Sequence, residues 1–290
     1  MSGRRTALRV LCAPDKLRGA VDAAGAARAL ADGVREAAGV PCELPVADGG
    51  EGTLDAIVEA TRGATVHVVT VADALGRPRA ARLAELPGDL FVVEAAEAVP
   101  LHALADSERD PAGASSAGVG ELIAAALDRG ARRLLVAVGG TATLDGGAGL
   151  LHALGAGGPR DGAGLLAFGA SDPSLPRAGS EPAAPDLAAV DARLRDVEIE
   201  LLSDVDAPLT GPHGTAHRFG PQKGATPDHV VALDAALRRW AAALGIDPAT
   251  PGAGAAGGIG AALQALGART RAGAEAVLDL VGFDALLADA

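Results

Sequence analysis

Short apolar runs alternate with longer amphipathic stretches over the first sixty residues. The run 8–13 (LRVLCA) ends at Pro14, and a second short run, 43–47, ends in a glycine-rich loop. Short apolar runs bounded by turn residues are typical of buried strands. Apolar residues at helical spacing over 23–38 and 54–61 predict that a helix follows each strand. This strand–loop–helix order favours a parallel α/β fold.

The pattern after residue 64 predicts a second, mixed sheet. Apolar runs separated by turn residues indicate strands at 65–71, 80–85, 90–95, 133–138 and 198–203. Helices are predicted at 119–129, with Ser116 or its neighbour Ser115 as the N-cap, and at 228–244. The segment 157–185 is rich in Gly, Pro, Ala and Ser, and we expect most of it to lie on the surface as a loop.

Composition and charge exclude several classes of protein. The chain has 290 residues, of which 49% are hydrophobic and 21% charged, and this balance is typical of a folded globular protein. The net charge of −12 and the aromatic content of 2%, with no Tyr, argue against binding to nucleic acid. No run of about 18 apolar residues is present. We therefore expect a soluble, cytoplasmic protein with no nucleic acid or membrane partner.

Three glycine-rich loops, at 48–53, 139–147 and 252–258, follow or precede predicted elements. A loop of this kind before a helix directs backbone N–H groups toward one point, which favours an anion such as phosphate. Each loop alone could be an ordinary turn, because the chain contains 40 glycines. Gly252, Gly254 and Gly257 match the G-x-G-x-x-G fingerprint of dinucleotide-binding folds, but no strand precedes them, and the P-loop motif is absent.

Charged residues in the loops are the candidates for chemistry. Lys16 and Lys223 are the only lysines of the chain, and both lie in loops flanked by Gly or Pro, where a compact point charge can bind an anion. Arg18 can hold a substrate carboxylate by two hydrogen bonds. Five loop carboxylates could accept a proton, bind Mg²⁺ or simply cap and brace their loops: Asp15, Asp48, Glu51, Asp145 and Asp204.

Seven sequence blocks occur in an order that resembles the bacterial glycerate kinase family. The blocks are APDKLRGA (13–20), ADGGEGT (47–53), GASSAGVGEL (113–122), GGTATLDGGAG (139–149), SDVDAPLTG (203–211), FGPQKGA (219–225) and PGAGAAGGIGAAL (251–263). The resemblance implies two α/β domains with the active site in the cleft between them. On that basis we expect a Rossmann-like three-layer domain of residues 1–72 and 235–290, and an inserted mixed-sheet α/β domain of residues 73–234.

The resemblance also implies ATP-dependent phosphorylation of D-glycerate to 2-phosphoglycerate with Mg²⁺. Catalytic roles are then expected for Asp15, Asp48 and Lys223, with Asp15 or Asp48 accepting the hydroxyl proton. The expected substrate-binding residues are Lys16, Arg18, Gly49, Gly50, Glu51, Gly52 and Thr53. The expected phosphate- or nucleotide-binding residues are Gly139, Gly140, Thr141, Thr143, Asp145, Gly146, Gly147, Gln222, Gly252, Gly254 and Gly257. Asp204 and Glu51 are the expected Mg²⁺ ligands.

The sequence departs from the family pattern at several of these positions. Where the family has PDSFKG or PDSYK this chain has PDKLRG, and family asparagines are replaced by Leu144 and Ala207. The family continues past the position of Ala290 into a GEG-x-x-D-x-Q segment that belongs to the first domain, so we expect an exposed sheet edge there. Three interpretations stay open: a working, shortened kinase, a catalytically silent relative that acts as a binding or structural partner, and an incomplete kinase. The oligomeric state is open as well.

Overall fold

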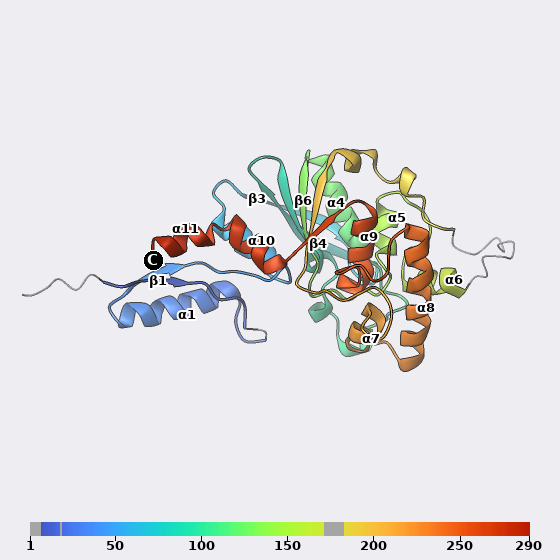
Figure 1. Ribbon diagram of the computed structural model, residues 1–290, viewed down its shortest axis with the longest axis horizontal. Helices are drawn as coiled ribbons and strands as arrows, with labels where there is room; N and C mark the ends of the chain where they lie inside the picture. The colour runs from blue at the N-terminus through green and yellow to red at the C-terminus, as the bar shows by residue number, and fades with distance from the viewer. Residues whose placement is uncertain (1–6, 18, 171–182) are drawn as a thin grey trace, which may run out of the picture.

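The computed structural model describes residues 7–17, 19–170 and 183–290, which form a mixed α/β fold (Figure 1). The strands are β1 (Arg9–Cys12), β2 (Val40–Glu43), β3 (Thr65–Ala72), β4 (Pro78–Leu86), β5 (Leu90–Glu94), β6 (Arg133–Ala137), β7 (Glu198–Leu202) and β8 (Arg269–Arg271). The α-helices are α1 (Ala23–Glu36), α2 (Thr53–Ala60), α3 (Ala95–Ala98), α4 (Ala117–Asp128), α5 (Ala148–Ala153), α6 (Gly162–Ala170), α7 (Thr215–Phe219), α8 (Pro227–Leu244), α9 (Ile259–Ala265), α10 (Gly273–Leu280) and α11 (Phe283–Ala288). The 3₁₀ turns are η1 (Leu101–Ala103), η2 (Asp106–Glu108), η3 (Leu187–Ala189), η4 (Ala192–Asp196), η5 (Pro221–Lys223) and η6 (Ala255–Gly258).

A six-stranded sheet forms the centre of the molecule, in the order β3-β4-β5-β6-β7-β8. β3, β4 and β5 pair antiparallel, as short turns between consecutive strands require, whereas β5, β6, β7 and β8 run parallel. The carboxyl ends of four neighbouring strands therefore share one edge of the sheet. In an open α/β sheet this edge is where ligands bind.

Successive side chains along the strands point to opposite faces of this sheet, and a hydrophobic core lies on each face. In β5, Phe91 and Val93 belong to the larger core, which also contains residues of α4, α5, α8 and α9, while Leu90 and Val92 belong to the smaller core with residues of α2 and α10. Successive side chains of a strand point to opposite faces, so a run that is apolar throughout is buried on both sides. All five residues of β5 are buried, which confirms the predicted strand 90–95 within one residue.

A small lobe of β1, α1 and β2 lies at one end of the molecule, and α10 leads from the main body toward it (Figure 1). β1 and β2 form a two-stranded parallel sheet, and no described residue pairs with its outer edges. The second strand was predicted at 43–47 but ends at Glu43, so that prediction is wrong in its bounds. The backbone N–H groups of Leu44 and Val46 still donate to Cys12 and Pro14, but Pro14 on the side of β1 has no N–H to continue a regular ladder.

The predicted helices agree closely with the structure. α1, α2 and α8 lie within two residues of the expected 23–38, 54–61 and 228–244. The expectation that 157–185 is mainly a surface loop is wrong for α6, because Leu165 and Phe168 are buried and Phe168 packs edge-on against Trp240 of α8 with ring centroids 5.6 Å apart. Residues 171–182 of this segment lie outside the described residues. No helix within the described ranges is long and apolar enough to cross a membrane.

The strand pairing constrains where domains can divide. The predicted boundary at 72/73 falls at the end of β3, which pairs with β4, and the boundary at 234/235 falls inside α8. β8, from the predicted first domain, pairs with β7. Both segments thus contribute strands to the sheet of the predicted inserted domain. The division into two domains stays a prediction.

Candidate functional site

Three loops meet at the carboxyl edge of the parallel strands. A Cβ added at Gly139, just after β6, would lie 2.4 Å from Gly50 Cα, and the Gly139 N–H donates to the Gly49 carbonyl at 3.3 Å. A Cβ at Gly273, the first residue of α10, would lie 2.2 Å from the Asp48 carbonyl oxygen. Only glycine permits backbones to approach this closely. These glycines therefore join the loops to one another.

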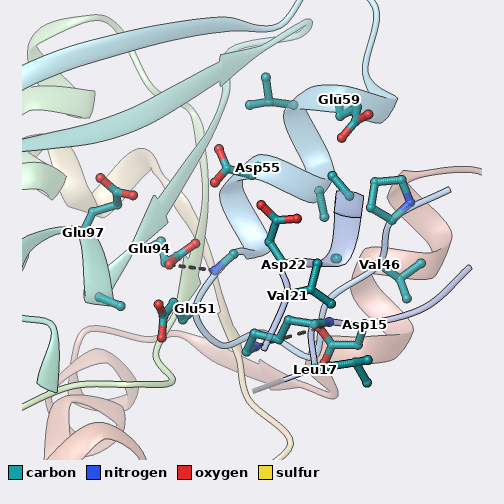
Figure 2. Close-up of a pocket in the computed structure, with 18 of the residues that line it drawn as sticks. Asp15, Leu17, Val21, Asp22, Val46, Glu51, Asp55, Glu59, Glu94 and Glu97 are labelled. Carbon is teal, nitrogen blue, oxygen red and sulfur yellow. Dashed lines mark hydrogen bonds and ion pairs between the residues drawn. The ribbon is translucent and has the colours of Figure 1, made fainter. Parts of the chain in front are cut away.

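Glu94, the last residue of β5, fixes the 48–53 loop to the central sheet. Its two carboxylate oxygens accept the backbone N–H groups of Gly52 and Leu54 at the start of α2, each at 3.0 Å. Figure 2 shows the Glu94 carboxylate directed at this turn. The side chain is only 3% exposed. Burial raises the pKa of Glu94 to about 7, although both N–H groups favour the ionised form.

A cavity of about 480 Å³ opens beside these loops. The predicted site residues on its wall are Lys16, Asp48, Gly49, Gly50, Glu51, Gly139, Gly140, Thr141, Asp204, Gln222 and Lys223. They come from five of the seven sequence blocks, which are far apart in the chain. The structure thus brings half of the predicted site residues together in one cavity, which we call the loop cavity.

A second cavity, of about 820 Å³, lies between the small lobe, α2 and the edge of the sheet; we call it the lobe cavity. Figure 2 shows Asp55 and Glu59 of α2 facing it, with Asp15, Leu17 and Val21 on the side of the small lobe. Lys16, Glu51 and His102 line both cavities. The two cavities therefore adjoin at these three side chains.

Lys223 is the buried cation of the loop cavity. It is the last residue of the short turn η5, and its ammonium group donates to the Thr143 carbonyl at 2.8 Å and to Thr141 Oγ1 at 3.4 Å. The residue is 3% exposed, and this burial lowers the pKa of Lys223 to about 7, while the negative charge of Asp145 opposes the shift. An anion bound in the cavity would stabilise the charged ammonium.

Lys16 lies between two of the candidate proton acceptors. Its Nζ is 3.6 Å from Asp48 Oδ1 and 3.9 Å from Asp15 Oδ1. The Asp48 side chain is 50% exposed, so solvent and a ligand can both reach it, and its Oδ1 also accepts the Gly50 N–H at 3.0 Å. Asp15 lines the lobe cavity but not the loop cavity. Arg18 lies outside the described residues.

The two predicted metal ligands differ in how free their oxygens are. The Asp204 oxygens accept the N–H groups of Gly273 and Ala274, at 2.8 and 3.2 Å, and so cap α10. Glu51 Oε1 lies 3.3 Å from His102 Nδ1, and the Glu51 side chain is 47% exposed. No cluster of three or more potential metal ligands exists within the described ranges. Mg²⁺ commonly takes one or two carboxylates together with phosphate oxygens and water, a requirement that Glu51 fits better than Asp204.

Asp145 is buried beneath the site and does not reach the cavity wall. Its carboxylate accepts the N–H and the hydroxyl of Ser116, both at 2.8 Å, and the N–H groups of Gly147 and Gly149. Burial raises the pKa of Asp145 despite these four hydrogen bonds. Ser116, predicted to cap the helix at 119–129, precedes α4 but makes no capping bond with its side chain. Both residues therefore brace the 139–149 loop.

Several other predicted site residues also lie behind the cavity wall. Thr53 and Thr143 are fully buried, and Thr53 Oγ1 donates to the Gly50 carbonyl at 2.6 Å. Gly52 lines the lobe cavity. The remaining predicted glycines are not on either cavity wall, and a Cβ added to each would meet another segment: Gly146 would meet Trp240, Gly147 Ala262, Gly252 Thr270, Gly254 Pro208 and Gly257 Thr143.

The two apolar replacements in the family pattern are core residues. Leu144 is fully buried and Ala207 is 2% exposed. Their side chains do not line either cavity. The loss of polar groups at these positions therefore leaves both cavity walls unchanged.

Sequence reasoning missed Glu94, His102 and Arg109, all of which line one of the two cavities. Glu94 ends an otherwise apolar run, and a carboxylate at the carboxyl end of a buried strand is a signal that could have identified it. His102 lies within η1 and Arg109 follows η2, and these short 3₁₀ turns carry no periodic pattern. Nothing in the local sequence distinguishes them from surface residues.

Comparisons with known proteins relate the chain to one family. The sequence profile of the glycerate kinase family matches residues 10–290. A glycerate kinase from Bacillus subtilis (strain 168) is 41% identical over 98% of this chain and 75% of its own length. The chain belongs to the glycerate kinase family. A glycerate 2-kinase from Escherichia coli (strain K12) is 38% identical over 93% of this chain and 71% of its own length.

The fold of this family member agrees with a solved relative. A crystal structure described as glycerate kinase 2 from Salmonella typhimurium LT2 superposes with a TM-score of 0.83 at 38% identity, covering 98% of this chain and 78% of that one. The predicted family and the mixed α/β fold class are therefore confirmed. The protein is a kinase, and its family supports phosphorylation of glycerate.

Proposed function

We propose that this kinase transfers the γ-phosphoryl group of ATP to the 2-hydroxyl of D-glycerate, giving 2-phosphoglycerate. The observation that carries the proposal is the junction of the two cavities at Lys16, Glu51 and His102. A phosphoryl transfer needs donor and acceptor oxygens roughly in line, with groups that neutralise the charge between them. Two adjoining cavities with charged side chains at their junction meet this need.

The loop cavity is the proposed site for the phosphates of ATP. Lys223 supplies a buried positive charge, and the backbone of the 139–141 loop lies on the same wall. Little water surrounds the ammonium group, so its interaction with a phosphate is weakly screened. Positioning and charge neutralisation are the main contributions that a protein makes to this reaction.

Glycerate is proposed to bind at the junction, with its carboxylate on Lys16 and Arg18. Asp48 is the proposed acceptor of the hydroxyl proton, because it lines the loop cavity and is half exposed, whereas Asp15 lines only the lobe cavity. Lys16, 3.6 Å from Asp48, would hold the substrate beside this carboxylate. Gly49 and Gly50 position Asp48 through the contacts with Gly273 and Gly139.

Mg²⁺ is proposed to enter together with ATP. When bound it neutralises charge on the phosphate oxygens as the transferred group leaves. Glu51 would hold it, because this carboxylate faces both cavities and its only ion-pair partner among the described residues is the exposed His102. Asp204 instead holds the start of α10 against the site. A cytoplasmic location, where ATP is available, is part of the same proposal.

A catalytically silent relative is the alternative, and one assay separates it from an active kinase. The purified chain is mixed with Mg-ATP and ADP release is followed with D-glycerate, with L-glycerate and without acceptor. We expect release that depends on D-glycerate at about 1–100 per second and that stops when Mg²⁺ is chelated. A folded chain that binds ATP yet gives no glycerate-dependent release would contradict the proposal.

A further inference from the structure

Arg109 is a second cation on the wall of the loop cavity, in direct contact with the segment that carries Lys223. It follows η2, and its Nη1 donates to the Gln222 carbonyl at 3.1 Å. A Cβ added at Gly224 would lie 2.4 Å from the Arg109 carbonyl oxygen. The two segments are 113 residues apart in sequence yet pack backbone to backbone. Arg109 and Lys223 are thereby held on one wall of the same cavity.

The hydrogen-bonding capacity of Arg109 is only partly used. Its Nη2 lies 2.8 Å from Asp106 Oδ1, but the Asp106 side chain is 90% exposed and stays largely hydrated. Nε is buried and finds no hydrogen-bond partner within the described part of the chain. A guanidinium has five N–H donors in a rigid fork, and a buried donor without an acceptor costs about 1–3 kcal/mol. The two Nη groups carry four N–H donors and make only the two contacts above among the described residues, so donors remain for a further acceptor.

The charges around Arg109 indicate what that acceptor is. Lys223 forms no ion pair with any described residue, and its nearest partners are uncharged oxygens of Thr141 and Thr143. The Asp204 carboxylate on the same wall is bound by the N–H groups of α10. Arg109 and Lys223 line the same cavity, and their positive charges repel each other unless an anion lies between them. A phosphate group, which carries more than one negative charge and several acceptor oxygens, fits both.

We propose that Arg109 is a phosphate-binding residue that pairs with Lys223 to hold the terminal phosphates of ATP. The proposal rests on the proposed function and adds a residue to it. An oxyanion could come from the phosphates or from the glycerate carboxylate. The phosphates are favoured because Arg109 lies beside Lys223 in the loop cavity and does not line the lobe cavity.

Variants of Arg109 test this assignment by separating the two substrates. R109A and R109K are compared with wild type and with R269A, which removes one exposed arginine away from both cavities. Steady-state assays give KM for ATP and for D-glycerate, and calorimetry gives the Kd of Mg-ATP without glycerate. We expect R109A to raise the KM and the Kd for ATP by about tenfold or more, since charged hydrogen bonds are lost, with the glycerate KM unchanged within about twofold.

Further outcomes distinguish ligand contact from a purely structural role. R109K keeps the charge without the fork and should lie between wild type and R109A, and added guanidinium ion should restore part of the ATP affinity of R109A. R269A should match wild type. An unchanged ATP affinity in R109A would overturn the proposal, as would a rise confined to the glycerate KM. A loss of ATP affinity in R109K that is accompanied by a lower melting temperature of the same variant would show a structural role and would also overturn it. If wild type binds Mg-ATP but does not turn over, the proposed function fails while the calorimetric comparison still tests Arg109.

Discussion

Replacing Glu94 by Gln should change how the stability of the protein depends on pH. Glu94 is 3% exposed, and its pKa is raised from 4.5 to about 7 by burial. Below pH 4.5 the carboxyl group is protonated in both the folded and the unfolded chain. Between about 4.5 and 7 the folded chain retains a proton that the unfolded chain has lost, so the free energy of unfolding falls as pH rises. This pKa shift corresponds to a decrease in the free energy of unfolding on the order of 3 kcal/mol across this pH range.

Urea unfolding of wild type and E94Q at a series of pH values between about 4 and 8 measures this effect. Gln keeps the shape of the side chain but does not titrate, so the stability difference between the two proteins should shift in favour of E94Q as pH rises. E59Q is the control, because Glu59 lines the same cavity on α2 but is exposed. E59Q should follow the wild-type pH profile. Parallel profiles for wild type and E94Q would refute the reasoning that burial dominates at Glu94.

Three further substitutions test the site. K223M should abolish glycerate-dependent ADP release, and an activity near that of wild type would contradict the phosphate role. Because the pKa of Lys223 is lowered in the folded chain, only the wild type gains stability as pH rises from about 7 to 10, so the free energy of unfolding of K223M should fall relative to that of wild type. Urea unfolding of both proteins at these two pH values checks the sign. D48N should lose turnover with an unchanged melting temperature, and full activity would remove Asp48 from the mechanism. G139A places a methyl group 2.4 Å from Gly50 Cα, so we expect a loss of about 1–3 kcal/mol in urea unfolding together with a lower kcat, whereas unchanged values would show that the loops need not touch.

Local patterns predicted the elements that make up the central sheet. The runs at 65–71, 90–95 and 133–138 correspond to β3, β5 and β6, because burial on one or both faces leaves a direct trace in the sequence. β8 has only three residues, Arg269–Arg271, and carries no apolar pattern, so it was not predicted. Its place is determined by pairing with β7, which is a contact between distant parts of the chain.

The candidate site was predictable in its loops but less so in the roles of individual residues. Glycine, lysine and acidic residues at strand ends identified the segments that meet at the loop cavity, because anion binding and proton transfer require these residue types. Whether an acid faces a ligand or braces a loop depends on burial. Asp48 is half exposed, whereas Asp145 has the same local setting and is fully buried by Ser116 and its own loop. That difference arises only when the chain is folded.

The position of the phosphate on the product tests the central proposal most directly. The purified chain is incubated with Mg-ATP and D-glycerate, and the product is analysed by NMR correlation between phosphorus and the protons of the glycerate carbons. Coupling of phosphorus to the single proton on C2 would identify 2-phosphoglycerate, as the proposed function predicts. Coupling to the two protons on C3, or the absence of any phosphorylated glycerate from a folded chain that binds ATP, would contradict it.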